Sequence, residues 1–448
     1  MKRQRLVAIV IGVIAMMLFG RMLAVMLWHP EMEPAPWSDR PAIYEVMVQA
    51  QRAGQNPATV ELPDAELYRQ AHEGQVFVPG AADGIRAKHG TGRDDAATAT
   101  LFAALQKALR SPQPSELKVL YEAMQVPALS VLDPLLDKIV ADGSFNAKHL
   151  HLLAMWLAQK APDREPVKTA LGLLGIMPAF DDRELFLQLG RNDEFTLFAA
   201  VALANQMGPN SEEVLWALAK EVHGWGRIYL VDRLAQTQQP TIKHWLLTAG
   251  HQNAVAVEYS AYACATGGGL LPALASDTLG DDVFAGAGAI LTALVLGQEG
   301  PAEGMADYAD GAMATERYLW HAGVRQSLNP DDLTAIVTLT DYVQNLVDEQ
   351  GRAAALGWSQ ARRDQIGWTA TEILRRPIVQ RQVEAELQRQ EPPRFRRAAR
   401  LALALGLGAA DAELTRLLTE AAQTEVPSVE QRTQVLQALS EKVGHKRR

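Results

Sequence analysis

Residues 190–206, GRNDEFTLFAAVALANQ, join a polar turn to a long apolar helix, and a similar arrangement recurs twice further along the chain. Residues 224–236, GWGRIYLVDRLAQ, and residues 250–265, GHQNAVAVEYSAYACA, also begin with a glycine-containing turn and continue as an apolar segment. The three starts lie about thirty residues apart, near the lower end of the period of two-helix repeats. This stretch therefore predicts a repeated helix–turn–helix unit.

The chain after residue 95 has the same helical texture almost throughout. Apolar residues recur at i, i+3, i+4 and i+7, and the segments end at Pro, Gly, Asn or Asp. The clearest expected helices are residues 97–110, 115–124, 147–159, 194–207, 212–222 and 242–249. Strand patterns are almost absent. Because short helices joined by tight turns stack as antiparallel hairpins, we predict an all-α fold, an α-solenoid.

The period and the alanine-rich second helices resemble those of HEAT-like helical-repeat proteins. In such repeats a polar turn leads into a helix with small residues where hairpins meet, and residues 394–407, RFRRAARLALALGL, look like another helix of this kind. The resemblance covers roughly residues 96–443. Residues 223–265 are also similar to segments of uncharacterised bacterial, membrane-anchored helical-repeat proteins. The resemblance implies a solenoid architecture and a binding role, and it transfers no catalytic residue.

The N-terminal region carries a second strong signal, an apolar run that begins at Leu6 and ends at Trp28. At roughly 1.5 Å per residue in a helix, this run reaches the ~30 Å thickness of the hydrocarbon core of a bilayer. Lys2, Arg3 and Arg5 precede it, and positive charge is retained on the cytoplasmic side. We therefore predict a single-pass signal anchor in the cytoplasmic (inner) membrane, with the N-terminus inside and the body periplasmic or extracellular.

A cleaved signal peptide is the competing interpretation of this run. The run is long for a signal peptide, and no small-x-small cleavage pattern occurs between residues 24 and 36. Arg21 interrupts the run near its outer end, where an arginine side chain can reach the lipid headgroups. The anchor is therefore the prediction that we carry forward.

The sequence predicts six segments. Residues 1–28 are the cytoplasmic stub and the anchor, residues 29–41 are a proline-rich spacer, and residues 42–95 are short helices with a glycine-rich loop. Residues 96–265 form a first HEAT-like array, residues 266–311 a Gly/Ala-rich irregular joint, and residues 312–448 a second helical array. Within the joint, residues 284–296 are too short to span a bilayer, so we expect a buried helix between flexible connections. The joint could be a hinge or only a long loop.

Composition excludes several classes of protein. The chain has 448 residues, 48% of them hydrophobic, which supplies ample core. Its single cysteine, Cys264, excludes an internal disulfide framework and a cysteine-rich metal site. With 43 basic against 52 acidic residues the net charge is −9, which gives no electrostatic support for binding nucleic acid.

The densest group of residues suited to recognition spans residues 223–264. Trp, Tyr, Arg and His combine a large contact area with directional hydrogen bonds, so interfaces favour them. The candidate binding residues are Trp225, Arg227, His244, Trp245, His251, Tyr259 and Tyr262. The alternative interpretation places both tryptophans in the core between repeats, Arg227 in a structural ion pair and the tyrosines at the seal of a hairpin. Both interpretations stay open at this point.

No catalytic or metal-binding motif stands out in the sequence. His149 and His151 would project about 200° apart on one helix, which is poor for chelation, and His223, His244 and His251 could converge only across hairpins. No His-Glu-x-x-His or Gly-x-Ser-x-Gly motif occurs. We predict no catalytic residue, metal or cofactor.

Paired carboxylates are the feature that a glycan hydrolase would need. The acid and the base of a helical-toroid glycosidase could come from Asp281, Asp282, Asp307, Asp310, Asp331 and Asp332. Aspartates at helix starts are also ordinary caps, and capping is the interpretation that we prefer.

Charge is distributed unevenly along the second half of the chain. Residues 277–349 are mainly acidic, and residues 352–400 are rich in arginine. Adjacent zones of opposite sign could steer a charged partner. They could equally pair with one another across neighbouring hairpins, as surface charges do.

These observations lead to one functional hypothesis and two alternatives. We expect a membrane-anchored helical-repeat scaffold that binds a protein or peptide partner at the outer face of the cytoplasmic membrane. The first alternative is a cell-envelope hydrolase of helical-toroid type that acts on glycans. The second is a cytoplasmic-facing adaptor, which requires the opposite membrane topology.

Overall fold

A computed structural model describes residues 35–73, 77–90, 92–298, 300–347, 351–389, 391–407 and 411–445. These residues form helices and connecting turns and contain no strand, so the predicted all-α class is confirmed. The chain divides into two compact units, residues 1–230 and 231–448. The boundary lies inside helix α13, Trp225–Leu234.

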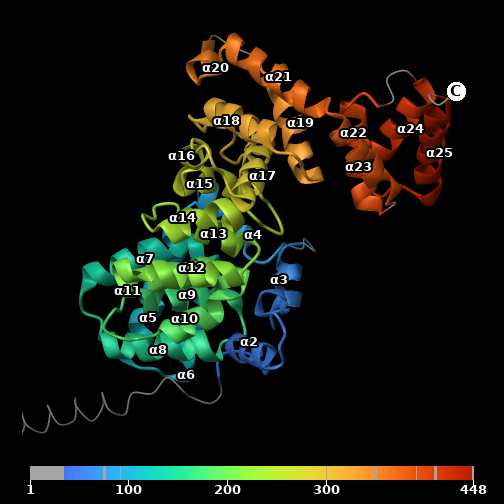
Figure 1. Cartoon of the computed structure of the whole chain (residues 1–448). Helices are drawn as coiled ribbons and strands as arrows, with labels where there is room; N and C mark the ends of the chain where they lie inside the picture. The colour runs from blue at the N-terminus through green and yellow to red at the C-terminus, as the bar shows by residue number, and fades with distance from the viewer. Residues whose placement is uncertain are drawn as a thin grey trace, which may run out of the picture. The chain divides into compact units, whose positions relative to one another are not determined.

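The first unit contains the helices from α2 to α13, coloured from blue to green in Figure 1. Their bounds are α2 (Ile43–Arg52), η1 (Pro57–Thr59), α3 (Ala65–Ala71), α4 (Ala81–His89), α5 (Asp95–Arg110), α6 (Pro114–Ala123), α7 (Ala128–Asp142), α8 (Ala147–Lys160), α9 (Arg164–Gly175), α10 (Arg183–Gly190), α11 (Asp193–Met207), η2 (Gly208–Asn210), α12 (Ser211–Glu221) and α13.

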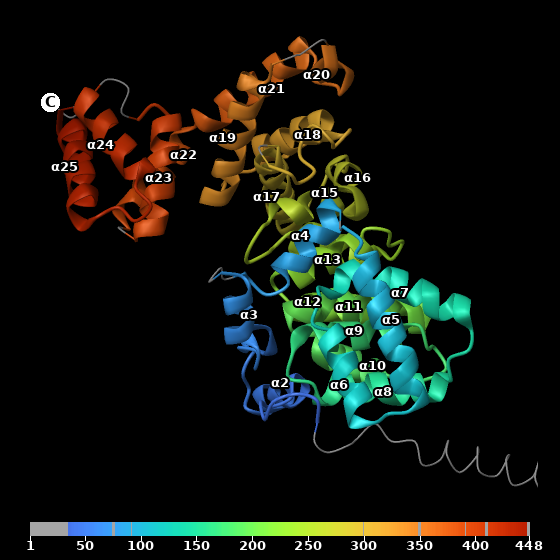
Figure 2. The ribbon, with the colours of Figure 1, turned by 180° about the vertical axis from the view of Figure 1, so that it is seen from behind.

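Helices of the first unit pack mainly on near neighbours in sequence. α5 contacts α6 and α7, α7 contacts α9, and α9 contacts α8 and α11, which in turn contacts α10. Alternate helices therefore stack on one another, as in an array of hairpins that share a core. This arrangement is consistent with an α-solenoid. Figure 2 shows the same helices from behind, with α5, α6 and α8 toward the viewer.

Helix α9 lies at the centre of this array because its sequence is apolar on most of its surface. Leu171 and Leu174 are fully buried. At Gly175 a Cβ atom would lie 2.9 Å from the Cα atom of Ala202, so α9 and α11 approach too closely for a larger residue. Small residues on these helices thus permit the close stacking that the sequence pattern predicts.

The N-terminal segment packs onto the array instead of standing away from it. The expected spacer, residues 29–41, is described from residue 35, where the Trp37 ring lies 4.6 Å from that of Trp156 and Arg40 forms an ion pair of 2.7 Å with Asp163. Helix α2 then packs on α8 and α10 (Figure 1). The end of the spacer is therefore part of the folded unit.

Within the expected glycine-rich loop, residues 81–89 form helix α4. The loop interpretation missed this helix because its apolar periodicity is weak. Gly80 precedes it with φ = +74°, a left-handed conformation that favours glycine. Its N–H donates a 2.9 Å hydrogen bond to Glu194. This hydrogen bond to α11 thus fixes the start of a helix that the local sequence pattern does not predict.

The second unit contains the rest of α13 and the helices from α14 to α25. Their bounds are α14 (Pro240–Trp245), η3 (Leu246–Gly250), α15 (Glu258–Gly268), α16 (Leu270–Leu274), α17 (Asp281–Gly297), α18 (Gly311–Val324), α19 (Pro330–Asn345), α20 (Arg352–Ala355), α21 (Gln360–Leu374), α22 (Pro377–Gln388), α23 (Pro392–Ala404), α24 (Ala412–Gln423) and α25 (Val429–His445).

The Gly/Ala-rich joint contains the expected buried helix, which is α17. At Gly286 a Cβ atom would lie 1.9 Å from the carbonyl oxygen of Leu247, in the π-helical turn η3. Gly288 faces the hydroxyl of Tyr318 with similarly little room. The small residues of this region therefore serve close helix packing, which is the physical reason for its unusual composition.

None of the described helices is both long enough and apolar enough to cross a membrane. The predicted anchor, residues 6–28, lies outside the described residues.

A substitution at Gly84 tests how closely α4 packs against Trp225. A Cβ atom at this position would lie 2.3 Å from the ring of Trp225. We expect Gly84→Ala to lower the free energy of unfolding by about 1–3 kcal/mol, because overpacking outweighs the gain in helix propensity. Gly367→Ala is the matched control, since that helical glycine has open space around it. Urea denaturation of both variants measures the change in the free energy of unfolding. A Gly84→Ala protein that is more stable than the wild type would contradict the close packing of α4 on Trp225.

Candidate functional site

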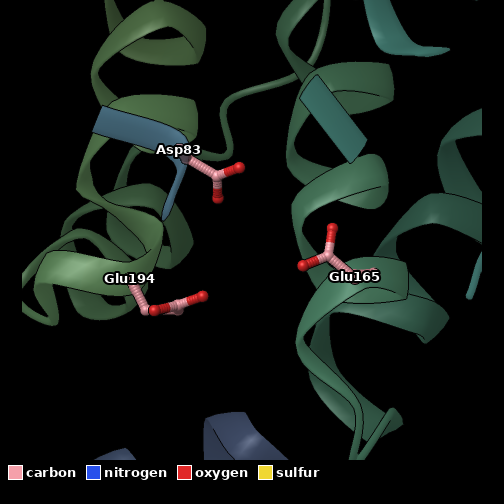
Figure 3. A group of neighbouring side chains, drawn as sticks. All are labelled: Asp83, Glu165 and Glu194. Atoms are coloured by element: carbon pink, nitrogen blue, oxygen red, sulfur yellow. The ribbon is translucent and has the colours of Figure 1, made fainter. Parts of the chain in front are cut away.

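A buried ammonium group stands at the centre of the first unit. Lys168, on α9, is 1% exposed, and its Nζ lies 2.6 Å from Asp83, 2.9 Å from Glu165 and 2.7 Å from Glu194. Figure 3 shows that the three carboxylates come from separate helices and converge on one space. We call Lys168 and these three acidic residues the Lys168 cluster.

The charges of the Lys168 cluster depend on one another. Burial lowers the pKa of Lys168, but the surrounding carboxylates, Glu194 foremost, outweigh burial and hold that pKa well above its usual range. Burial raises the pKa of Glu194, whereas Lys168 and Arg164 lower it more strongly, to about 2. The pKa of Glu165 is raised, because the effect of burial outweighs that of the neighbouring Lys168. The lysine therefore stays a cation, and the Glu194 carboxylate stays ionised beside it.

The Lys168 cluster ties four helices together. Asp83 belongs to α4, Glu165 and Lys168 to α9, and Glu194 to α11. Glu165 also accepts a 2.7 Å hydrogen bond from the backbone N–H of Ala128, at the start of α7. The cluster thus connects α4, α7, α9 and α11 through charge-assisted hydrogen bonds.

Asp83, Glu165 and Glu194 are also the one acidic group in the described part of the chain whose oxygens lie close enough to hold a metal ion. The ammonium of Lys168 lies within hydrogen-bond distance of all three, at the point that a cation would take. A side chain of the protein therefore already supplies one positive charge to the three carboxylates. The chemistry of this donor set is that of an internal ion pair network.

An adjoining arginine extends the network to α3. Arg164 donates to both carboxylate oxygens of Asp64 at 3.0 Å, and its guanidinium lies 3.7 Å from the centre of the Tyr68 ring. It also lies 3.3 Å from Glu194. The N-terminal segment that carries α3 and α4 is thus bound to the array by buried charges.

The two turns that define the repeat in the sequence meet in space. Asp193, from the first turn, accepts hydrogen bonds from the N–H groups of Gly224 at 3.2 Å and Gly226 at 2.7 Å, from the second turn. A Cβ atom at Gly226 would lie 2.3 Å from the hydroxyl oxygen of Thr196, so only glycine fits. Burial raises the pKa of Asp193 to about 6, although these N–H donors lower it in part.

Beside the Lys168 cluster lies a groove of about 320 Å³ within the first unit. Its walls come from α4, α7, α9, α11 and α13. Phe198 lines it, and the Lys168 ammonium lies 5.8 Å from the centre of that ring. The apolar lining residues are Leu129, Leu132, Leu136, Leu197, Phe198 and Val201. Arg86, Asp133, Asn205 and Tyr229 supply polar groups. We call this feature the unit-1 groove.

The residues predicted as a binding surface divide between the two units. In the first unit Trp225 is 8% exposed and packs against Gly84 of α4, while Arg227 is 5% exposed and contacts His223 at 3.1 Å. Trp225 therefore supports the α4 wall of the groove from behind. Tyr229, one turn further along α13, lines the groove itself.

The other predicted binding residues lie in the second unit. Trp245 and His251 are buried. Tyr259 and Tyr262 are half-buried, and His244 is exposed and lies 3.2 Å from Asp282. The candidate block is therefore not one exposed surface, and its two tryptophans lie in the core, as the alternative interpretation has it.

Sequence reasoning did not identify the Lys168 cluster. One signal was available, since Lys168 interrupts the apolar helix REPVKTALGLLG at residues 164–175. A lysine at a core position is almost never buried without a partner. Its partners are 26 and 85 residues away for Glu194 and Asp83, so no local pattern could name them.

The acidic and basic zones of the second unit pair with one another. Asp331 forms an ion pair with Arg397, and Glu316 lies 2.8 Å from Arg362. Within the acidic zone itself, Asp281 lies 3.3 Å from Arg325, and the side chain of Asp307 accepts a hydrogen bond from the N–H of Gly304. Three of the aspartates considered for a hydrolase, Asp281, Asp307 and Asp331, are thus engaged with three different partners.

No protein-family model matches the chain, and comparisons with curated proteins and with solved structures give no significant match.

The substitution Lys168→Met tests how much the buried ammonium contributes to stability. The substitution removes the counter-charge of Asp83 and Glu165 and leaves Glu194 with Arg164 alone, so we expect the free energy of unfolding to fall by about 3–5 kcal/mol. Neutralising the partners as well, in Lys168→Met with Asp83→Asn and Glu194→Gln, should recover part of that loss. Urea denaturation measures both. A loss below about 1 kcal/mol in the single variant would contradict the assigned role.

Asp193 gives the protein a specific dependence on pH. Its folded-state pKa of about 6 lies above the value of an unfolded aspartate, ~3.9. The folded state therefore binds the proton of Asp193 more tightly than the unfolded state does. The stabilisation that this proton gives is present below pH ~4 and is lost as the pH rises through 6. Between these values the free energy of unfolding changes by at most about 1.4 kcal/mol per pH unit.

Asp193→Asn keeps an acceptor for Gly224 and Gly226 but does not titrate. We expect the free energy of unfolding of the variant, taken relative to that of the wild type, to increase as the pH rises from 4 to 7. Denaturation at a series of pH values measures this difference. A difference that stays constant over the range would show that Asp193 is not the titrating group.

Proposed function

We propose that this chain is a membrane-anchored helical-repeat scaffold that binds a protein or peptide partner without covalent chemistry. The unit-1 groove carries the proposal. Its floor is apolar, it opens to solvent between helices, and side chains of both charges stand at its edge. An apolar groove with a charged edge suits the apolar face of an amphipathic helix.

The size and charges of the groove favour one kind of occupant. A volume of about 320 Å³ lies at the lower end of the range for ligand sites, so the groove accommodates a few large side chains. Arg86 on α4 and Asp133 on α7 have opposite charges and can pair with charged residues that flank those side chains. We therefore propose an amphipathic helix of a partner protein as the occupant.

The architecture supports the same function. Stacking of alternate helices in the first unit agrees with an α-solenoid of HEAT-like hairpins, a fold that presents extended surfaces for binding. The apolar run at residues 6–28 would hold the scaffold at the membrane, with the body periplasmic or extracellular. Anchoring raises the effective concentration of a bound partner near that surface.

Neither alternative gains support from a specific contact. A glycan hydrolase needs two carboxylates that act together, and Asp281, Asp307 and Asp331 each have a partner of their own. A cytoplasmic adaptor would use the same groove and differ only in the side of the membrane. Proteolysis of intact spheroplasts distinguishes that topology, because an exported body is digested from outside.

The groove is tested by placing a photo-crosslinking residue, p-benzoylphenylalanine, at Val201 in cells. Val201 lines the groove, whereas Val140, on α7, is 70% exposed and lies outside its lining. We expect a defined crosslinked partner from position 201 and none from position 140. The crosslinked segment, made as a peptide, should bind the full chain and lose at least about tenfold in affinity to Val201→Glu but not to Val140→Glu.

Two results would refute this function. The first is the same set of crosslinked products from both positions. The second is a crosslinked small molecule in place of a peptide, which would make the groove a ligand pocket. Circular dichroism of both variants checks that each remains folded.

A further inference from the structure

A larger cavity, of about 680 Å³, lies within the second unit between α17, α19 and α20. One of its walls is polar, because α19 presents Thr338, Asp341, Tyr342 and Asn345 to it. These positions follow the i, i+3, i+4, i+7 spacing of a single helix face. The rest of the lining is mostly apolar and comes from Val295, Ala306, Leu346, Val347, Ala353, Leu356 and Trp358, with the polar side chains of Gln298 and Arg352 among them.

Two opposite charges line this cavity without pairing. Among the described residues, the carboxylate of Asp341 and the guanidinium of Arg352 make no hydrogen bond or ion pair, with each other or with another group. Both residues are exposed to solvent, and partial burial of its carboxyl raises the pKa of Asp341. Nearby arginines behave differently: Arg362 lies 2.8 Å from Glu316, and Arg363 donates to the carbonyl of Leu346. The cavity thus offers one acceptor and one donor of full charge.

The wall also contains a buried donor. The Nε1 atom of Trp358 is buried and has no hydrogen-bond partner among the described residues, and the side chain is fully buried. Tyr342 lies edge-on to it, with the ring centres 5.4 Å apart. Because this N–H is closed off from solvent, Trp358 belongs to the packed wall of the cavity and offers no donor to a ligand.

We propose that this cavity binds a short peptide with both termini free, with its ammonium group at Asp341 and its carboxylate at Arg352. Charge-assisted hydrogen bonds at each end would fix its orientation. The apolar wall would receive its side chains. A volume of about 680 Å³ suits a ligand of two or three residues and leaves much of the space to water around a single amino acid. This site is independent of the unit-1 groove and of the scaffold function.

The test is isothermal titration calorimetry of the full chain with the dipeptide Leu-Leu, its N-acetylated form and its C-terminal amide. We expect Leu-Leu to bind and each blocked form to bind at least about tenfold more weakly. Asp341→Asn should abolish the discrimination against the acetylated form only. Arg352→Gln should abolish the discrimination against the amide only. Asp277→Asn, an exposed aspartate of the same unit outside the cavity, is the control and should change neither.

Three results would overturn the proposal. They are the absence of Leu-Leu binding to the wild type up to ~10 mM, equal affinity for the blocked forms, and unchanged discrimination in both cavity variants. Because discrimination compares ligands on one folded protein, a general loss of stability in a variant cannot imitate the expected pattern.

Discussion

The first unit depends on one interaction, the contact of the buried Lys168 ammonium with the carboxylates of Asp83, Glu165 and Glu194. A lone lysine at the centre of an apolar helix would be too costly to bury, and so would the carboxylates without it. Together they form a network whose members lie on α4, α9 and α11, with Glu165 reaching the start of α7. The helices must therefore take the positions at which these charges meet.

The unit-1 groove is a consequence of that constraint. The walls of the groove include the helices that the Lys168 cluster connects, and Trp225 and Asp193 add α13 to the same assembly. Of the helices that line the groove, α4 is the one that its own sequence favours least. Its apolar periodicity is weak, and its start requires a glycine in the left-handed conformation. The first unit thus uses charge in its interior to hold in place the helices that line an apolar groove.

Sequence periodicity predicted the helical class and most helices from residue 97 onward, because an apolar stripe at helical spacing is a local property. It also predicted the buried helix within the Gly/Ala-rich region. It missed α4 and the Lys168 cluster, since both depend on contacts between residues far apart in the chain. The candidate binding block shows the same limit: residue type alone does not distinguish a core tryptophan such as Trp225 from an interface tryptophan.

If the Lys168 cluster holds α4 in place as a wall of the groove, removing the ammonium should loosen that helix first. Hydrogen exchange of the α4 amides, residues 81–89, in Lys168→Met under native conditions measures this. We expect these amides to lose protection while those of α5 to α8 keep theirs. Unchanged protection of α4 in the variant would show that packing on Trp225 and the Gly80–Glu194 hydrogen bond hold the helix without the lysine.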